Sequence, residues 1–426
     1  MVPASAMTEA QKNDFLAQVR AIRGYSHAYL ATWYGDAVIM DFVPATADDA
    51  KLPREPEAKV KEHAMNDLKW SADHIAEKPA EKGRIAKGTV LSMIARFNLL
   101  WGNYSEALDA ANRVIALNQY ELDPDFLNMF SMAGQGSKEI ICTYEHVQTT
   151  YAFTDVIRLY NNADGGWASA VPTQKLVDMF EMADGTPFDW NNPVHKAHPF
   201  FDAQGNPVRD IRMYETLYVN GDQFRGRELR IAKGESEGCD DISPVLFRLT
   251  YNGYGMRKFQ RDRADEVNGK FYSCPLIRLP EIYLNIAEAM NELGKATTKD
   301  EFGNDAYDYI NMVRNRVNMP DLTTAKAAPG RELREAILHE RAIEFGYEEV
   351  RYFDLVRWKR SDLFKTDIER LVITKNGDES FDYVRDNKLV NPRGWIKRWT
   401  DRYFLIPIPL DEINKKYGLV QNPGWE

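Results

Sequence analysis

Two neighbouring segments near the N-terminus have the period and the spacing of a helical hairpin. Apolar side chains recur every three or four positions through residues 85–101 and again through residues 104–118, with Gly102-Asn103 between them. The pair occupies 34 residues, which is the period of the tetratricopeptide repeat. Ala107 and Ala111 are small enough for two helices to approach closely. The spacing therefore predicts a scaffold of antiparallel helical hairpins.

A long irregular region interrupts the helical pattern. Between residues 121 and 275 the helical period is mostly lost, while glycine, proline, asparagine and aromatic residues accumulate. One short helix at 173–181 and short strands at 139–144 and 213–219 are expected there. Because long loops inside a compact chain are frequently functional, this region is the expected ligand-binding part.

Helical periodicity on both sides of that region completes the predicted scaffold. Further helices are expected at residues 8–34, 57–77, 278–293, 305–316, 331–347 and 350–360. We therefore predict a single, mainly α domain over residues 1–426. It consists of a tetratricopeptide-like helical-hairpin scaffold (8–120 and 276–360), a loop-rich insert with a few short strands (121–275) and an irregular C-terminal segment (361–426).

Charge and cysteine content exclude several classes of protein. The 54 Lys and Arg against 64 Asp and Glu give a formal net charge of −10, so the average surface repels nucleic acid. The sequence contains no run of about 20 apolar residues that would span a membrane as a helix. Cys142, Cys239 and Cys274 lie far apart without CxxC spacing, which excludes a zinc ribbon.

The densest charged pattern lies between Glu340 and Trp358. Glu340, Glu344 and Glu348 share one helical face, and two of them would in principle supply the acid and base of a glycoside hydrolase. Each carboxylate also has an arginine within helical reach, which favours the ionised form and removes the raised pKa that a general acid needs. The pattern is therefore interpreted as an ion-pair network.

No other pattern for catalysis or for a bound group stands out. His195 and His198 are close in sequence, but no further ligand spacing completes a tetrahedral metal site, so residues 193–199 are interpreted as a solvated loop. A nucleophile elbow, a phosphate-binding loop and a dinucleotide-binding fingerprint are absent from the sequence. We expect no catalytic residues, no metal and no cofactor.

The loop-rich region contains aromatic rings beside amide and charged side chains. A sugar ring has an apolar face that stacks on an aromatic ring, while its hydroxyls bind planar polar groups. The candidate binding residues in this region are Trp167, Trp190, Phe224, Tyr251, Asn162, Asp164, Asp222 and Arg225. For any single ring the alternative is packing into a hydrophobic cluster of the loop itself. For the set we expect at least two exposed rings and a carbohydrate ligand.

Several motifs resemble the SusD/RagB family and occur in the family's order. In the C-terminal part they are Arg278-x-x-Glu281-x-Tyr283-Leu284-x-x-Ala287-Glu288-Ala289, Asn311-x-Val313-Arg314-x-Arg316, the pattern from Glu340 to Trp358, Pro407-Ile408-Pro409, and Gln421-Asn422-Pro423-Gly424-Trp425. Upstream they are Arg23-Gly24-Tyr25-Ser26-His27-Ala28-Tyr29, Tyr34-Gly35-Asp36, the hairpin at 83–118, Pro172 to Asp178, and Asp184-Gly185. The resemblance spans nearly the whole chain.

The resemblance implies a non-catalytic, surface-exposed lipoprotein of the Gram-negative outer membrane. Such a protein binds an oligosaccharide and delivers it to a TonB-dependent, SusC-like transporter. Asp41 and Phe42 occupy a loop that borders the ligand site in the family, so both join the candidates. The family's signal peptide and lipidated cysteine are missing from this sequence, so membrane attachment is expected through a lipidated N-terminus that this chain lacks.

Three positions depart from the family pattern, and one of them is Pro280, which replaces a usual alanine at the first turn of a helix, where a missing N–H costs little. Asn318 and Glu349 stand where the family usually has glycine. Asparagine tolerates the left-handed backbone that often follows a helix, so Asn318 is compatible with the fold. None of the three positions lies in the predicted ligand-binding part.

Two other functions stay open at the level of sequence. One is a helical-repeat scaffold that binds peptides or proteins without binding a glycan. The other is a glycoside hydrolase that uses the carboxylates between Glu340 and Trp358. The glycan-binding subunit is the preferred interpretation, and the sequence does not identify its glycan.

Overall fold

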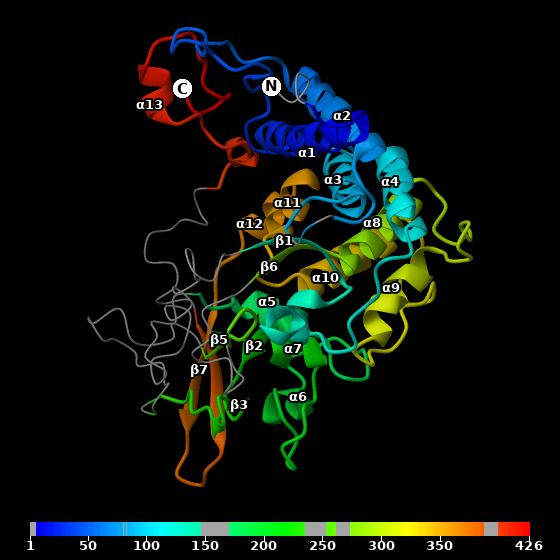
Figure 1. The fold of residues 1–426 in the computed structure, drawn as a ribbon. Coiled ribbons are helices and arrows are strands. Elements are labelled where there is room, and N and C mark those ends of the chain that lie inside the picture. The colour runs from blue at the N-terminus through cyan, green and yellow to red at the C-terminus, as the bar shows by residue number, and fades with distance from the viewer. Residues whose placement is uncertain are drawn as a thin grey trace. The chain divides into compact units, whose positions relative to one another are not determined.

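The computed structural model describes residues 6–79, 81, 83–145, 170–233, 235, 253–260, 273–386 and 399–426. The chain is divided between two compact units. The first contains Met1–Gln119, Phe353–Ser361 and Trp399–Glu426, and the second contains Tyr120–Tyr352 and Asp362–Arg398. Each unit is described by itself, and Figure 1 shows the order of the elements along the chain.

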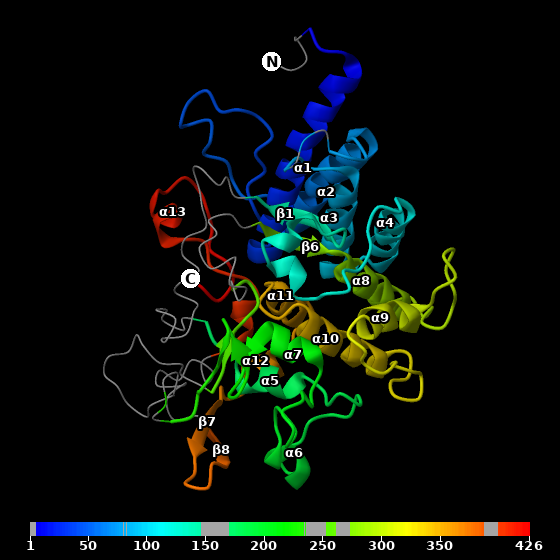
Figure 2. The same ribbon diagram turned by 60° about the horizontal axis from the view of Figure 1, so that its bottom comes forward.

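Four helices of the first unit confirm the helical periods of the sequence. They are α1 (Glu9–Tyr34), α2 (Glu57–His74), α3 (Lys87–Leu100) and α4 (Tyr104–Ala116). α1 packs along α2, and α3 packs along α4 (Figure 2). The second of these pairs is the predicted 34-residue hairpin.

Local signals set both ends of α1. The hydroxyl of Thr8 accepts the backbone N–H of Gln11, and the Gln11 side chain accepts the N–H of Thr8 at 3.0 Å, which caps the N-terminus. Gly35, at a φ of +70°, ends the helix. Gly24 is required by packing, because a Cβ there would lie 2.9 Å from the carbonyl oxygen of Ala64 on α2. A side chain at position 24 would push the two helices apart.

The C-terminal segment of the chain completes the first unit. It includes α13 (Leu410–Asn414) and the short 3₁₀ helix η7 (Asp401–Phe404). Arg54, in the loop between α1 and α2, donates to the carbonyl of Val420 at 2.7 Å and to Oδ1 of Asn422 at 2.6 Å. The C-terminal motif around Asn422 therefore connects the end of the chain to the loop between α1 and α2.

The second unit combines helices with two-stranded antiparallel sheets. Its helices are α5 (Gln174–Met179), α6 (Pro193–Ala197), α7 (Ile211–Thr216), α8 (Leu279–Glu292), α9 (Ala306–Asn315) and α10 (Arg331–Glu344), with 3₁₀ turns η2 (Asn128–Phe130) and η3 (Ala133–Gly136). α11 (Val350–Arg357) and α12 (Ser361–Phe364) each contain residues of both units.

The described strands pair two by two. They are β1 (Ile140–Tyr144) with β6 (Cys274–Arg278), β2 (Leu217–Tyr218) with β5 (Gly255–Met256), β3 (Gln223–Phe224) with β4 (Arg227–Glu228), and β7 (Arg370–Lys375) with β8 (Phe381–Asp386). The protein is mainly helical with a few short strands, which confirms the predicted fold class.

Residues 213–219 are not the strand that the sequence predicted. α7 occupies most of them, and only Leu217–Tyr218 is extended. Asp210 starts the helix because its carboxylate accepts the backbone N–H of Arg212 at 2.9 Å. Aromatic and β-branched residues favoured a strand, but this cap and the burial of the Arg212 side chain outweigh that preference.

Two segments predicted to be irregular contain regular structure. Residues 193–197 form α6 because Asn192 caps the helix and Pro193 occupies its first turn. In the C-terminal segment, β7 and β8 form a hairpin whose turn begins at Asn376-Gly377. Leu371 and Ile373 alternate inward along β7 and are buried. Asn-Gly beside such alternation is a hairpin signal that the sequence analysis missed.

The two departures from the family's glycines have the same backbone conformation. Asn318, which follows α9, has a φ of +59°, and Glu349, between α10 and α11, has a φ of +63°. A left-handed backbone favours glycine because a Cβ is strained there. The backbone of this chain at both positions is therefore one that favours glycine.

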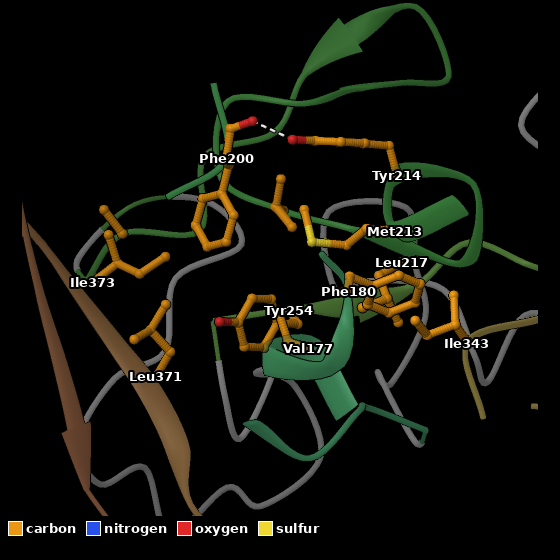
Figure 3. Close-up of a cluster of buried hydrophobic side chains, with 12 residues drawn as sticks. Val177, Phe180, Phe200, Met213, Tyr214, Leu217, Tyr254, Ile343, Leu371 and Ile373 are labelled. Atoms are coloured by element: carbon orange, nitrogen blue, oxygen red, sulfur yellow. Dashed lines mark hydrogen bonds between the residues drawn. The ribbon is translucent and has the colours of Figure 1, made fainter. Parts of the chain in front are cut away.

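A hydrophobic cluster of the second unit joins segments that are distant in sequence (Figure 3). Its buried members are Val177, Phe180, Phe200, Met213, Tyr214, Leu217, Val219, Ala232, Tyr254, Ile343, Leu371 and Ile373. The hydroxyl of Tyr214 donates to the carbonyl oxygen of Phe200. The cluster fixes α5, α7, α10 and β7 to one another.

Glu344 on α10 is the centre of a buried ion-pair network in the second unit. Its carboxylate accepts from Arg316 at 2.7 Å, from Arg278 at 3.0 Å and from Arg212 at 3.1 Å. The exposed fractions of these side chains are 0% for Glu344 and Arg212, 1% for Arg278 and 3% for Arg316. The three arginines follow or belong to α9, β6 and α7, so the network links these elements to α10.

Neighbouring carboxylates extend the network. Glu340 accepts from Arg314 at 2.8 Å and shares the arginine of α7 with Glu344. Glu348 accepts from Lys258 at 2.8 Å and shares the arginine of β6. Each buried charge thereby has an opposite charge at hydrogen-bond distance, which burial requires.

The ion-pair interpretation is confirmed, but the partners are not those expected from helical reach. Glu340, Glu344 and Glu348 bind cations of other segments, whereas Asp354 and Arg357, 2.8 Å apart, are a pair within one helix. Burial by itself raises the pKa of Glu344, but its three arginines outweigh burial and hold that pKa well below its ordinary value. Glu344 is therefore ionised and does not serve as a general acid.

We expect Glu344→Gln to lower the free energy of unfolding by about 3–5 kcal/mol, because it removes one partner of a buried pair and leaves arginine charge uncompensated. Denaturant unfolding followed by circular dichroism measures the change. Glu349→Gln, five residues away at an exposed position, is the matched control and should shift the midpoint little. Equal stability of the two variants would contradict a central role for Glu344.

Candidate functional site

Six of the ten predicted site residues lie in the described part of the chain. Trp190, Asp222, Phe224 and Arg225 belong to the second unit, and Asp41 and Phe42 belong to the first. The other four, Trp167, Tyr251, Asn162 and Asp164, lie outside the described residues and stay predictions.

Trp190 is held at its edge by hydrogen bonding. Its indole Nε1–H donates to Oδ1 of Asp178 on α5 at 2.8 Å. The ring meets Phe188 edge to face, with centroids 5.0 Å apart, and lies 6.2 Å from the ring of Tyr383 on β8. The side chain is partly buried and packs against the hydrophobic cluster of Figure 3. Its orientation is therefore fixed before any ligand binds.

Further polar and charged side chains contact Asp178, the partner of Trp190, and the neighbouring Asp189. Arg385 on β8 lies 3.6 Å from Oδ2 of Asp178, and Gln174 donates to Oδ1 of Asp178 at 2.7 Å. Asn191, next to Trp190, is exposed and donates to Asp189 at 3.1 Å. We call Asp178, Phe188, Trp190, Tyr383 and Arg385 the Trp190 cluster.

The sequence analysis selected only one member of the Trp190 cluster. Asp178 closes the Pro172 to Asp178 motif, but nothing in the sequence links it to Trp190. Tyr383 and Arg385 were missed because the β7–β8 hairpin that carries them was not predicted. The Asn376-Gly377 turn was the available signal.

Phe224 is enclosed within the second unit. Its side chain is 1% exposed and packs with Tyr218, 5.2 Å between ring centroids, and with Leu229 and Ile231. This placement matches the alternative that the sequence left open for each single ring. A binding role of Phe224 stays a prediction, and its packing role is what the structure describes.

Asp222 and Arg225 flank Phe224 on the β3–β4 hairpin. Oδ2 of Asp222 lies 3.1 Å from a guanidinium nitrogen of Arg257, and the Asp222 side chain is largely buried. Arg225 has a φ of +52° at the turn, followed by Gly226 at +77°. The hairpin thus brings Arg225 to the turn and Asp222 to its base.

Asp41 and Phe42 lie on a loop that α1 anchors. Arg23 donates to the carbonyl of Asp41 at 3.3 Å, and Nε2 of His27 accepts the backbone N–H of Met40 at 3.2 Å. Phe42 is 45% exposed and Asp41 is also exposed. The loop therefore presents one ring and one carboxylate to solvent at the surface of the first unit.

His195, considered as a metal ligand in the sequence, has other contacts. Its Nδ1 accepts the backbone N–H of Asp189 at 3.1 Å, and its ring stacks on Phe188 with centroids 5.5 Å apart. In the described ranges no three His, Cys, Asp or Glu side chains gather as metal ligands would.

A search of the described residues finds no helix with the length and apolarity needed to cross a membrane.

Glu215, near the C-terminal end of α7, is a partly buried ionisable group. Burial, with a contribution from Asp125, raises its pKa to about 7, and Arg316 offsets only part of that effect. In the described part of the chain its Oε2 has no hydrogen-bond partner. Between about pH 4.5 and pH 7, the folded protein therefore keeps a proton on Glu215 that the unfolded chain has released.

We expect Glu215→Gln to flatten the dependence of stability on pH. Because the folded pKa lies above the unfolded one, the stabilisation is complete below about pH 4.5 and is lost as pH rises through about 7. The wild-type protein should lose up to about 3 kcal/mol of unfolding free energy over this range relative to the variant. Denaturant titrations at pH 5 and pH 8 measure the difference, and parallel profiles would contradict the raised pKa.

The described structure combines helical hairpins with loops that carry aromatic rings and planar polar side chains. The model of the SusD family matches residues 134–425 of this chain. The match covers more than half of the chain, and the protein belongs to the SusD family.

Relatives and solved structures agree with this assignment. A SusD-like protein of Formosa agariphila is 24% identical, over 98% of this chain and 75% of its own length. A SusD-like protein of Bacteroides ovatus is 21% identical, over 83% of this chain and 61% of its own length. The crystal structure of a SusD-like protein from Bacteroides fragilis superposes with a TM-score of 0.81 at 26% identity, over 99% of this chain and 82% of that one.

A second structure from Bacteroides fragilis shows the same fold. It is described as a SusD-like carbohydrate-binding protein and superposes with a TM-score of 0.77 at 23% identity, covering 96% of this chain and 80% of its own. At 23% identity this similarity shows that the two proteins share a fold. It does not show that they bind the same ligand.

Proposed function

We propose that this protein is a non-catalytic, cell-surface glycan-binding subunit that delivers oligosaccharide to a TonB-dependent, SusC-like transporter. The observation that carries the proposal is membership of the SusD family over residues 134–425. The carbohydrate-binding relative of the same fold supports the class of ligand. Attachment to the outer membrane through a lipidated N-terminus and uptake of a nutrient glycan are parts of the same proposal.

The Trp190 cluster has the side chains that a sugar requires. The ring of Trp190 offers an apolar surface, and its fixed orientation avoids an entropic cost of ordering on binding. Asp178 and Arg385 can accept from and donate to hydroxyl groups, and exposed Asn191 adds an amide. Ring stacking together with a few hydrogen bonds suits weak, reversible capture of an oligosaccharide.

The remaining candidates form the rest of the proposal. They are Trp167, Phe224, Tyr251, Asn162, Asp164, Asp222 and Arg225 in the loop-rich part, and Asp41 and Phe42 on the anchored loop of the first unit. Ionisation of Glu344 and the ion pairing of Glu340 and Glu348 support the absence of catalysis at that carboxylate pattern.

We expect Trp190→Ala to weaken glycan binding by about 1–3 kcal/mol, a loss comparable to that of one aromatic ring that stacks on a nucleic-acid base. A glycan array identifies a bound oligosaccharide, and calorimetric titration then compares the variant with the wild type. Trp70→Ala, at a partly buried tryptophan that stacks on His74 of the first unit, is the matched control and should leave affinity unchanged. The same titration with Trp167→Ala tests the second predicted ring.

Melting temperatures separate binding from packing in these variants. A ring that only packs would lower the melting temperature and leave the affinity intact, and that result would remove Trp190 from the site. Binding of peptides with no binding of any glycan would favour the helical-repeat scaffold instead. Release of reducing sugar by the purified protein would contradict the non-catalytic function.

A further inference from the structure

The first unit contains a pocket of about 760 Å³ that none of the predicted site residues lines. Its walls come from α1, α2, the C-terminal end of α3, residues 353–359 and the C-terminal segment. Its volume is in the range of pockets that hold small organic ligands. All of these walls belong to the first unit, so the pocket is complete within that unit. We call it the first-unit pocket.

One part of the lining is aromatic. Trp101 donates from its Nε1–H to the hydroxyl of Thr32 at 3.1 Å, so the indole is held at its edge. Phe353 packs edge to face on Trp33 with centroids 4.9 Å apart. Both Trp101 and Phe353 are partly buried, and both line the pocket. This side of the pocket suits a ligand with an apolar face.

Two of the four cations in the lining already have carboxylate partners. Lys61 lies 2.5 Å from Glu57, which also lines the pocket. Arg357 lies 2.8 Å from Asp354, whose side chain is 0% exposed. In these two pairs the carboxylate neutralises the cation, so Lys61 and Arg357 contribute little net positive charge to the binding of a ligand.

The other two cations have no ion pair with any described residue. Lys359 is exposed, at a φ of +50°, and lines the pocket without a carboxylate within 4.0 Å. Arg402 donates to the carbonyl of Gly424 at 3.0 Å and lies over the Trp425 ring at 4.4 Å, with no carboxylate partner. On a chain of net charge −10, this unbalanced positive charge favours an anionic ligand.

The lining also contains acceptors. Asp401 is exposed and lines the same pocket, and Glu57 is partly exposed there. Each of these carboxylates can accept hydrogen bonds from hydroxyl groups. A ligand that combines an apolar ring face, an anionic group and hydroxyls satisfies all three parts of the lining.

We propose that the first-unit pocket binds an acidic oligosaccharide, in which a sugar ring carries a carboxylate. The carboxylate pairs with Lys359 and Arg402, the apolar ring face lies against Trp101 and Phe353, and the hydroxyls donate to Asp401. This inference rests on the proposed glycan-binding function but assigns a second site, separate in sequence from the Trp190 cluster.

Calorimetric titration of the whole chain with a galacturonic acid hexamer tests the pocket. The wild type should bind the hexamer, bind its fully methyl-esterified form about tenfold or more weakly, and lose affinity as salt rises. Lys359→Gln should weaken binding of the acid by about threefold to tenfold. Lys416→Gln is the matched control, because Lys416 is also exposed in the first unit with a φ of +58° and lies outside the pocket.

The outcomes separate this inference from the proposed function. Equal binding of the acid and its ester, or an unchanged affinity of Lys359→Gln, would overturn the acidic site while leaving neutral glycan binding at Trp190 in place. Insensitivity of the acid's affinity to Trp190→Ala supports a second site. Binding of a glutamate hexapeptide that equals binding of the galacturonate, and that Lys359→Gln weakens equally, would mean a pocket for acidic peptides and overturn the sugar assignment.

Discussion

The second unit depends on neutralising the buried carboxylate of Glu344. An ionised carboxylate without exposure to water is costly unless several cations reach it with good geometry. α7 and β6 supply two of those cations, Arg212 and Arg278, and the third, Arg316, directly follows α9. A shift of any of these elements would leave charge uncompensated at α10. The network therefore selects one arrangement of the helices more sharply than apolar packing alone, which tolerates exchange of side chains.

Periodicity and capping allowed the main helices to be predicted because both are local. Thr8, Gln11 and Gly35 bound α1 through contacts within a few residues. The partners of Glu344 are distant in the chain, so sequence spacing showed that the carboxylates would be paired but not with which cations. α7 was read as a strand for a related reason: the burial of Arg212 against α10, which a local pattern does not contain, outweighs strand propensity.

The candidate site shows the same limit at the level of single rings. Trp190 and Phe224 have similar neighbours in sequence, with asparagine and aspartate beside both. Tyr218 and Leu229 enclose Phe224, whereas Trp190 is fixed by Asp178 and keeps part of its surface exposed. Contacts with residues distant in sequence therefore determine that Phe224 packs inside and that Trp190 stays partly exposed. Tyr383 and Arg385 could likewise not be assigned to the Trp190 cluster from the sequence, because the β7–β8 hairpin that carries them was not predicted.

The hydrogen bonds of Arg54 have a consequence for the order of folding. The first unit is built from both ends of the chain, and Arg54 ties the α1–α2 loop to Val420 and Asn422. During synthesis from the N-terminus, the ribosome must release almost the entire chain before these bonds form. α1 to α4 therefore lack their contacts with the C-terminal segment while the second unit is synthesised. The bonds of Arg54 to Val420 and Asn422 therefore form only after every residue of the second unit, which ends at Arg398, has been synthesised.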